Sequence, residues 1–582
     1  MIAKIKMEYV CLLFLWGFIS LFVLRAPNDQ FPFADTDDYM RLVYVLEYMT
    51  GNLGWYDHII SRSNVPFGCD IHWTHLYDLI LIAGTYIFKP FYTTLKEALL
   101  NWSIIVTPLI SCFSIIMFYK ICRHFFSKEL SVLSGILFVF HPFIYAQIRM
   151  YRPDHHALLI LFSIIMVKFF IDFIKSVDSV KFHTSAFKLG VAYSLAITAS
   201  PELLIVVLPL ELFFVIHWCI FKRKASIIAL KSWYWLLTII LCYVVFSSDG
   251  YHAIQNIDYD KISIVHVALA FASAGFWSII SAYNKRKTNV STKQAILFVI
   301  GVGAPIIAAI WLIFPDIIYL MSGKISPELK TLWLSKVSEM RSPLRDMGHS
   351  CFWMLLMLFA LTVHGILITY KRYMYNLKLE HKFFIIYSFI VIFIYAVIGA
   401  ITYRVLYYFS IFSIPLVIIS LLNIKLSFVS NKYKKHAIIQ LFAILMYIIP
   451  ISLALIAHNK NKNNIDELDV IKFLNTIKTP SVILAPQVLG PKILFYTNHS
   501  IITAPYHRQE YGLLAGCKVF TSDKATLGDL QEIIKTSNIS YIIIPTDNTS
   551  SICKQLLNNQ LPSYLERINA KIKNGMIIKV RN

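Results

Sequence analysis

The chain has 582 residues, of which 57% are hydrophobic and only 15% are charged. Soluble globular proteins carry about 25% charged residues, so this composition excludes a soluble multidomain protein and indicates a polytopic membrane protein. The formal net charge is +21, but the basic residues lie in short clusters between apolar runs. They therefore indicate membrane topology rather than a nucleic-acid surface. The nine cysteines are scattered and form no CxxC pair, which favours neither a zinc site nor a disulfide framework.

Thirteen apolar runs approach the length of about 20 residues that a helix needs to cross a membrane. They are residues 8–25, 98–119, 131–147, 157–174, 186–200, 202–220, 232–248, 262–283, 294–315, 350–370, 382–400, 404–424 and 436–457. The first run follows Lys4 and Lys6 and has no small-residue cleavage site, so we interpret it as a retained helix rather than a signal peptide.

Basic residues alternate between the connections of these helices. Six connections together carry 22 lysines and arginines: 119–129, 175–188, 221–231, 284–293, 370–382 and 425–435. Four short alternate connections, 148–156, 200–202, 248–262 and 401–404, carry only four. The positive-inside rule then predicts a cytoplasmic N-terminus, with the loops 26–97, 148–156 and 316–349 outside. This topology requires that the apolar segment 76–92 lies along the membrane surface instead of crossing it.

The tail of the chain changes character after residue 457. Runs at 481–485, 492–496 and 541–545 are typical of strands, and those at 463–477, 525–537 and 562–573 are typical of helices. The sequence therefore predicts a transmembrane domain over 1–457 and a small soluble α/β domain over 458–582. We expect an integral protein of a bacterial inner membrane whose C-terminal domain lies in the periplasm.

Polar residues concentrate in the loops predicted to lie outside. The densest group is 35–41 (DTDDYMR), with Asp35, Asp37 and Asp38 in four positions. Three carboxylates at this spacing suit a hard divalent cation. The same residues also suit a helix N-terminus, where Asp35 or Thr36 caps and the acids interact favourably with the helix dipole. Both interpretations stay open at this point.

A second group, 149–156 (RMYRPDHH), fills a very short loop between two spans. Ionisable residues at membrane depth are functional by default, and the alternative is a set of interfacial anchors. Its arginines, Arg149 and Arg152, suit a phosphate.

Two further segments stand out. Residues 336–343 (KVSEMRSP) lie in the long outer loop, where an amphipathic surface helix is the alternative interpretation. Arg404 stands at the mouth of a late span among tyrosines, and an arginine there also suits snorkelling to the interface.

These four segments together resemble the catalytic subunit of oligosaccharyltransferases, which belong to the GT-C membrane glycosyltransferases. That family has thirteen spans, an outer catalytic face and a C-terminal domain outside. Its metal-binding Asp before a Tyr matches Asp37, and its DHH motif matches 154–156, which implies Asp154 and His156 as metal ligands. Its SVSE motif matches three letters of KVSE, so Glu339 would contact the acceptor. Its arginine for the lipid-linked pyrophosphate matches Arg404.

The chain departs from that family in one motif. WWDYG, which reads the Ser/Thr of an Asn-x-Ser/Thr acceptor in the family, is missing. The acceptor is therefore open between a lipid, a glycan and a protein site. Residues 506–508 (YHR) in the tail could contact an acceptor or form a satisfied surface cluster, and the tail could also be a packing domain without a catalytic role.

The resemblance implies transfer of a sugar or oligosaccharide from a polyprenyl-(pyro)phosphate donor. A divalent metal, Mg²⁺ or Mn²⁺, would be held by Asp37, Asp154 and His156, and the imidazole shifts the preference towards Mn²⁺. Asp37 and Glu339 would act on the acceptor nucleophile. The remaining expected site residues are Arg404 and Arg152 for the donor, with Asp35, Asp38, Arg41 and His155 in secondary positions.

Two other classes of function stay open. One is another GT-C polyprenyl-phosphate-sugar transferase that modifies lipids or glycans. The other is a transporter or flippase, which should carry charges within its spans and an internal repeat. Here the carboxylates lie in loops and no repeat appears, which argues against transport. We expect no nucleic-acid partner.

Overall fold

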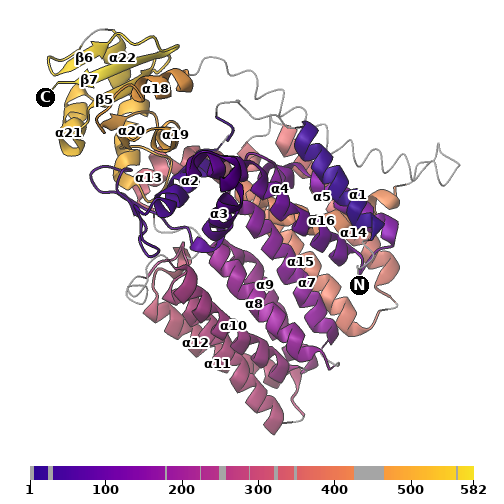
Figure 1. Cartoon of the computed structure of the whole chain (residues 1–582). Coiled ribbons are helices and arrows are strands. Elements are labelled where there is room, and N and C mark those ends of the chain that lie inside the picture. Colours follow the sequence, from indigo (N-terminus) through magenta and orange to yellow (C-terminus); the bar gives the residue numbers. More distant parts are fainter. Residues whose placement is uncertain are drawn as a thin grey trace.

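The structure is a computed structural model. It describes residues 6–23, 31–33, 35–176, 180–222, 224–247, 257–287, 289–319, 325–345, 350–375, 377–424, 465–558 and 561–581. Within these residues nine helices are long and apolar enough to cross a membrane, and a bent helix pair makes a tenth candidate. The predicted class, a polytopic helical membrane protein, is confirmed (Figure 1).

The long helices follow the predicted apolar runs. They are α4 (Leu95–Cys122), α7 (His156–Ser176), α9 (Leu204–Phe221), α10 (Ala225–Phe246), α11 (Ile264–Arg286), α12 (Thr292–Ile313), α14 (Ser350–Tyr373), α15 (Leu379–Ile401) and α16 (Leu406–Leu422). The predicted spans at 8–25 and 186–200 are helices too, α1 (Met7–Phe18, continued by η1, Ile19–Val23) and α8 (Phe182–Ala199). These two are shorter or less apolar than the nine. The predicted span at 436–457 lies outside the described residues.

The predicted span 131–147 is not one straight helix. It is broken into α5 (Lys128–Phe140) and α6 (Pro142–Ile148), which meet at 68°. Pro142 begins α6, because proline has no N–H to donate and its ring clashes with the preceding helical turn. The break lets α6 run directly into the short loop 149–155, so that the end of α6 and this loop lie on one side of the bundle.

The two ends of the bundle carry different connections. At one end Lys175 lies 2.9 Å from His124, and Lys222 lies 2.7 Å from Thr292. The N-terminal helix starts at the same end, because Glu8 lies 3.0 Å from Lys128. The described lysine-rich connections therefore share one end, as the charge pattern predicts.

One lysine was assigned to the wrong environment. Lys231, counted with the connection 221–231, is fully buried in α10, which begins at Ala225 instead of near 232. Its ammonium pairs with Glu211 of α9, and this partner allows the charge to be buried.

The opposite end of the bundle, which we call the domain face, consists of residues 35–91, 149–156, 200–203, 257–263, 317–319, 325–345 and 402–405. On it lie α2 (Thr36–Met49), the antiparallel pair β1 (Ile59–Ile60) and β2 (Cys69–Asp70), and α3 (His75–Phe88) with η2 (Lys89–Phe91). The 14 residues of α3 span about 21 Å, too short for a hydrocarbon core of about 30 Å. This agrees with the requirement that the segment 76–92 does not cross.

The long loop on the domain face consists of short helical pieces. These are η5 (Ile317–Tyr319), α13 (Pro327–Leu332), η6 (Leu334–Lys336), η7 (Ser338–Met340) and η8 (Pro343–Arg345), with η3 (Pro201–Leu203) and η9 (Tyr403–Val405) nearby at the starts of α9 and α16. The alternative interpretation of 336–343 as an amphipathic helix is wrong. The backbone N–H of Tyr403 donates to Arg341 O at 3.1 Å, and the Thr402 hydroxyl donates to Glu339 O at 2.8 Å. These bonds fix η7 against η9.

The C-terminal residues form an α/β domain around one five-stranded sheet. Its elements are α18 (Glu467–Leu474), β3 (Val482–Leu484), α19 (Gly490–Tyr496), β4 (Ser500–Ile501), α20 (Glu510–Thr521), α21 (Leu527–Ser537), β5 (Tyr541–Pro545), α22 (Ser551–Leu557), β6 (Leu565–Ile568) and β7 (Gly575–Val580). The strand order is β4-β3-β5-β7-β6, with β3 parallel to β4 and β5 and the remaining pairs antiparallel.

Two predicted elements of this domain are wrong. Residues 492–496 lie in α19, where Pro491 favours a helical first turn. The sequence did not distinguish helix from strand here, because an apolar run that is buried on most sides shows no clear hydrophobic periodicity. Residues 562–573 contain the edge strand β6, where pairing with β7 decides the conformation. The other predicted elements, at 463–477, 481–485, 525–537 and 541–545, correspond to α18, β3, α21 and β5.

The C-terminal domain packs on the domain face (Figure 1). Arg62 donates to Leu494 O at 3.3 Å and to His499 O at 3.1 Å. Asn64 Oδ1 accepts the N–H of Gly512 at 2.8 Å, where a Cβ would come within 2.0 Å of Ile502 O. One apolar core runs from α2 and α3 into α18 and α19. The predicted domain boundary near 458 falls outside the described residues.

Candidate functional site

The first predicted group of acids begins α2. The carboxylate of Asp35 accepts the N–H of Asp37 at 3.3 Å, and the carboxylate of Asp38 accepts the N–H of Asp35 at 3.3 Å. This reciprocal capping box satisfies backbone donors at the helix start. The capping interpretation is therefore correct for Asp35 and Asp38, while the carboxylate of Asp37 takes no part in the box.

The second group lies between α6 and α7. The carboxylate of Asp154 lies 2.6 Å from His155 Nδ1 through Oδ1 and 3.4 Å from His156 Nε2 through Oδ2. The loop is fixed to α4, because Tyr151 N–H donates to Ile104 O at 3.2 Å. All three residues of the DHH segment are buried, and their ligand atoms lie within 4.8 Å of one another.

Arg152 joins three segments of the domain face. Its guanidinium lies 3.0 Å from Asp35 Oδ2, 3.7 Å from Asp154 Oδ2 and 3.5 Å from Glu339 Oε1. The side chain is only 11% exposed, so these charged contacts are little screened by water. The predicted site residues of three loops expected to lie outside therefore lie together, although 187 positions separate Arg152 from Glu339.

Asp37 belongs to the same neighbourhood. Burial, followed by the negative charges of Asp35, Asp154 and Glu339, raises the pKa of Asp37 well above its ordinary value, and Arg152 opposes this only in part. Like charges that are brought together disfavour one another's ionisation. The cluster thus contains four carboxylates and one closely paired guanidinium, an excess of negative charge that a bound cation would relieve.

Asp154 behaves in the opposite way. Burial alone would raise the pKa of its carboxyl, but the hydrogen bond and charges of His155 and the charges of His156 and Arg152 lower it well below the usual range. Asp154 is therefore an ionised acceptor at neutral pH. Burial lowers the pKa of His155, and the charge and hydrogen bond of Asp154 oppose this shift in part.

Arg404 is held by an acid that the sequence analysis did not select. Its Nε lies 2.6 Å from Glu202 Oε2, and Glu202 Oε1 accepts the hydroxyls of Tyr407 at 2.7 Å and Tyr408 at 3.0 Å. Glu202 is 8% exposed. The signal was present in the sequence, because this acid directly follows Ser200-Pro201 at the start of a span, in the shortest of the connections predicted to lie outside.

A cavity of about 100 Å³ joins the two halves of the site. It is lined by Phe143, Ala146, Gln147, His156, Glu339, Tyr403, Arg404 and Tyr407. His156 and Glu339 thus face the same space as Arg404. The broken helix α5–α6 contributes three of the lining residues, which is the structural consequence of Pro142.

The remaining predicted residue, Arg41, turns into the protein core. It lies 2.8 Å from Asp78 Oδ1, with its guanidinium carbon 4.1 Å from the centre of the Trp73 ring. Asp78 also contacts His75 at 3.3 Å. Both members of the Arg41–Asp78 pair are almost fully buried, so these contacts point to a structural part in holding α2 against α3.

The donor set of the acidic cluster fits a divalent cation. Carboxylate oxygens suit Mg²⁺, and carboxylates with an imidazole suit Mn²⁺. His156 Nδ1 is buried without a hydrogen-bond partner among the described residues, and Asp37 is surrounded by like charges. The ligand-type atoms that lie within 4.8 Å of one another belong to Asp154, His155 and His156. His155 thus lies beside two of the expected ligands, and an ion shared with Asp37 stays a prediction.

The fold is like that of archaeal oligosaccharyltransferases of known structure. The crystal structure of the Archaeoglobus fulgidus oligosaccharyltransferase in the apo form matches with a TM-score of 0.73 at 14% identity, over 93% of this chain and 69% of that one. The archaeal oligosaccharyltransferase AglB from Archaeoglobus fulgidus, in complex with an inhibitory peptide and a dolichol-phosphate, matches with a TM-score of 0.69 at 13% identity, over the same shares.

A third structure, the Archaeoglobus fulgidus oligosaccharyltransferase in complex with Zn and sulfate, matches with a TM-score of 0.68 at 12% identity, over 93% of this chain and 68% of that one. No model of a protein family matches the sequence, and no curated protein sequence matches it. The likeness therefore lies in the three-dimensional arrangement, and it confirms the expected oligosaccharyltransferase-like fold.

Proposed function

We propose that this chain is a metal-dependent GT-C glycosyltransferase that moves a sugar or oligosaccharide from a polyprenyl-(pyro)phosphate donor to an acceptor at the domain face. The single observation that carries the proposal is the convergence of residues from separate loops. Arg152 contacts Asp35, Asp154 and Glu339, and the adjoining cavity is shared by Glu339 and Arg404. The fold, matched by a dolichol-phosphate complex of an oligosaccharyltransferase, supports the same conclusion.

In this proposal Asp37, Asp154 and His156 hold Mg²⁺ or Mn²⁺. Such an ion, when bound, supplies Lewis-acid stabilisation of negative charge on the departing phosphate. Asp154 is suited to ligation because its neighbours favour its ionised form. Asp37 has a raised pKa, which suits a carboxylate that orients the acceptor or takes its proton.

Arg404 binds the donor phosphate. Its planar fork suits phosphate oxygens, and Glu202 fixes the orientation of the guanidinium at the cavity. Glu339, which lines the same cavity, positions the acceptor. For Arg152 the contacts favour a different role from the expected donor binding: it keeps the carboxylates of three loops together, and a direct phosphate contact is secondary.

The lipid part of the donor has a matching apolar space. A cavity of about 280 Å³ lies among α4, α7, α9, α15 and α16, and its lining is almost entirely hydrophobic. It includes Phe118, Phe170, Val206, Tyr395, Ile411 and Pro415. Since Ile411 and Pro415 belong to the same helix whose first turn follows Arg404, an isoprenoid chain in this cavity would extend from a phosphate at Arg404.

A transfer assay with purified protein tests the proposal. Lipid-linked sugars are extracted from membranes of the source cells, radiolabelled and incubated with the protein in detergent with Mn²⁺ and membrane acceptors. We expect label to leave the donor lipid, and Asp154→Asn to slow this by about 100-fold or more, since the stabilisation at stake is several kcal/mol. The matched control is Asp172→Asn, at the other end of α7. Equal activity of Asp154→Asn and the wild type would refute the proposal.

Comparing glycolipids and glycoproteins of cells with and without the gene then identifies the acceptor. The glycan that disappears from lipid, polysaccharide or protein names the acceptor class, which the lack of WWDYG leaves open.

A further inference from the structure

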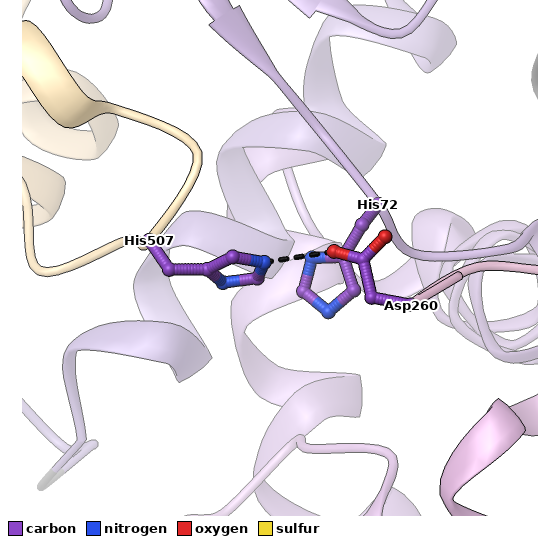
Figure 2. A group of neighbouring side chains, drawn as sticks. All are labelled: His72, Asp260 and His507. Atoms are coloured by element: carbon purple, nitrogen blue, oxygen red, sulfur yellow. Dashed lines mark hydrogen bonds and ion pairs between the residues drawn. The ribbon is translucent and has the colours of Figure 1, made fainter. Parts of the chain in front are cut away.

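A second cluster of ligand-type side chains lies where the C-terminal domain meets the bundle. His72 follows β2, Asp260 precedes α11, and His507 lies between β4 and α20, so the three come from separate parts of the chain. Figure 2 shows the His507 imidazole directed at the Asp260 carboxylate, with the His72 ring beside them. One nitrogen of each ring and one carboxylate oxygen lie within 4.8 Å of one another, and His507 Nε2 lies 2.8 Å from Asp260 Oδ2.

We propose that His72, Asp260 and His507 bind a divalent transition-metal ion, with Zn²⁺ as the best fit, and that this ion ties the C-terminal domain to two loops of the domain face. Two imidazoles and one carboxylate are a common zinc ligand set, completed by water at the fourth position. Mg²⁺ and Ca²⁺ prefer sites built from oxygen ligands alone. The site shares no residue with the acidic cluster around Asp154.

The surrounding residues orient the ligands as outer-shell groups do in metal sites. Arg508 Nε donates to Asp260 Oδ2 at 3.0 Å and thereby holds the carboxylate. The Tyr506 hydroxyl accepts the backbone N–H of His72 at 2.7 Å and also contacts the His72 ring. Each of the three ligands is therefore held by a contact to another segment before any ion binds.

The local charge suits a dication. Asp70, Asp258 and Asp260 contribute three negative charges, against the positive charges of Arg508 and Lys261. The net charge of this group is negative with neutral imidazoles, so an added cation is attracted rather than repelled. An ion pair with Asp260 would need only one imidazole. A second imidazole is present, because the ring centroids of His72 and His507 are 4.7 Å apart.

A bound ion would fix the position of one loop of the C-terminal domain. Residues 504–508 would be fixed to the first outer loop, and His72 is close enough to His155 for the two to interact electrostatically. The metal would therefore hold the C-terminal loop beside the acidic cluster.

Zinc content of the full-length protein in detergent tests the site without any activity assay. The protein is stripped with a chelator, equilibrated with Zn²⁺ and washed, and bound zinc is measured by mass spectrometry. We expect His507→Ala to bind one zinc ion per chain fewer than the wild type. His507→Cys, which restores a zinc ligand, should regain it, and His183→Ala, an exposed histidine on α8, should not change the content.

Zinc bound at the acidic cluster is distinguished by repeating the measurement in the variant Asp154→Ala. The double variant Asp154→Ala/His507→Ala should bind one zinc ion per chain fewer than Asp154→Ala, whether or not the acidic cluster binds zinc. Zn²⁺ should also raise the midpoint of thermal unfolding of Asp154→Ala but not of the double variant. Unchanged zinc content on replacing His507, or loss in both the Ala and the Cys variant, would overturn the proposal. Neither result would bear on the proposed sugar transfer.

Discussion

Nε of Arg404 lies 2.6 Å from Oε2 of Glu202, across a sequence separation of 202 residues. This contact links the start of α9 to the start of α16 and fixes a guanidinium at the wall of the cavity that Glu339 also lines. The side chain of Glu202 is only 8% exposed, whereas that of Arg404 is 36% exposed. The carboxylate is therefore buried, and the guanidinium is partly open to the cavity. The acid positions the arginine, and the arginine keeps one side towards a ligand.

The first prediction separates binding from stability at this pair. Arg404→Ala should weaken donor-lipid binding by about 1.5–3 kcal/mol if one charge-assisted hydrogen bond is lost. It should also lower stability, by about 3 kcal/mol, since Glu202 is left buried without its partner. The double variant Arg404→Ala/Glu202→Gln should recover stability but not donor binding. Recovery of both in the double variant would show that Arg404 acts only through stability.

The second prediction assigns Glu339 to the acceptor. Glu339→Gln keeps the size of the side chain and its backbone bond to Thr402, so the loop should stay in place. We expect acceptor use to fall while purified Glu339→Gln still binds donor lipid in the presence of Mn²⁺. Glu328→Gln, on the exposed side of α13 in the same loop, is the control. A loss of donor binding as large as that of Arg404→Ala would place Glu339 in the donor site instead.

The third prediction concerns topology. The described lysine-rich connections share one end of the bundle, and the C-terminal domain packs at the other. A reporter that is active only in the cytoplasm should therefore be silent when fused after Asn582 and active when fused after Lys287. Activity of the first fusion would reverse the assigned sides.

The fourth prediction tests helix packing. A Cβ on Gly365 of α14 would come within 2.1 Å of Leu416 O in α16, so the two backbones can approach only because this residue is glycine. Gly365→Ala should lower stability by about 1–3 kcal/mol, the usual effect of overpacking. Gly301→Ala in α12 meets nothing within 4 Å and should be neutral or stabilising by up to about 1 kcal/mol. Thermal unfolding in detergent compares the two.

Much of the site could be predicted from the sequence, because its residues lie in short local motifs. Asp37, Asp154 and Glu339 stand in loops that lysine counts place on one side, and Arg152 bridges the acids of those loops. A loop between two membrane-spanning helices must lie at one of the two membrane surfaces. Charged residues in these loops can therefore gather only at one end of the bundle or at the other. Their convergence on one end therefore follows from topology.

Other relationships depend on the tertiary structure. Glu202 was not selected because its partner Arg404 is 202 residues away, and the cluster of His72, Asp260 and His507 needs three segments that share no local pattern. Residues 492–496 form a helix rather than a strand because burial on most sides removes the period that distinguishes the two.

Hydrophobicity and charge along the chain thus determined that this protein crosses the membrane, which connections share a side and which loops carry its acids. Those are properties of single segments in a medium that penalises unpaired polar groups. Which acid holds Arg404, which helix breaks and where the C-terminal loop docks were decided by packing between segments. A contact such as Arg508 with Asp258 depends on the distance between folded elements, which the order of residues does not state.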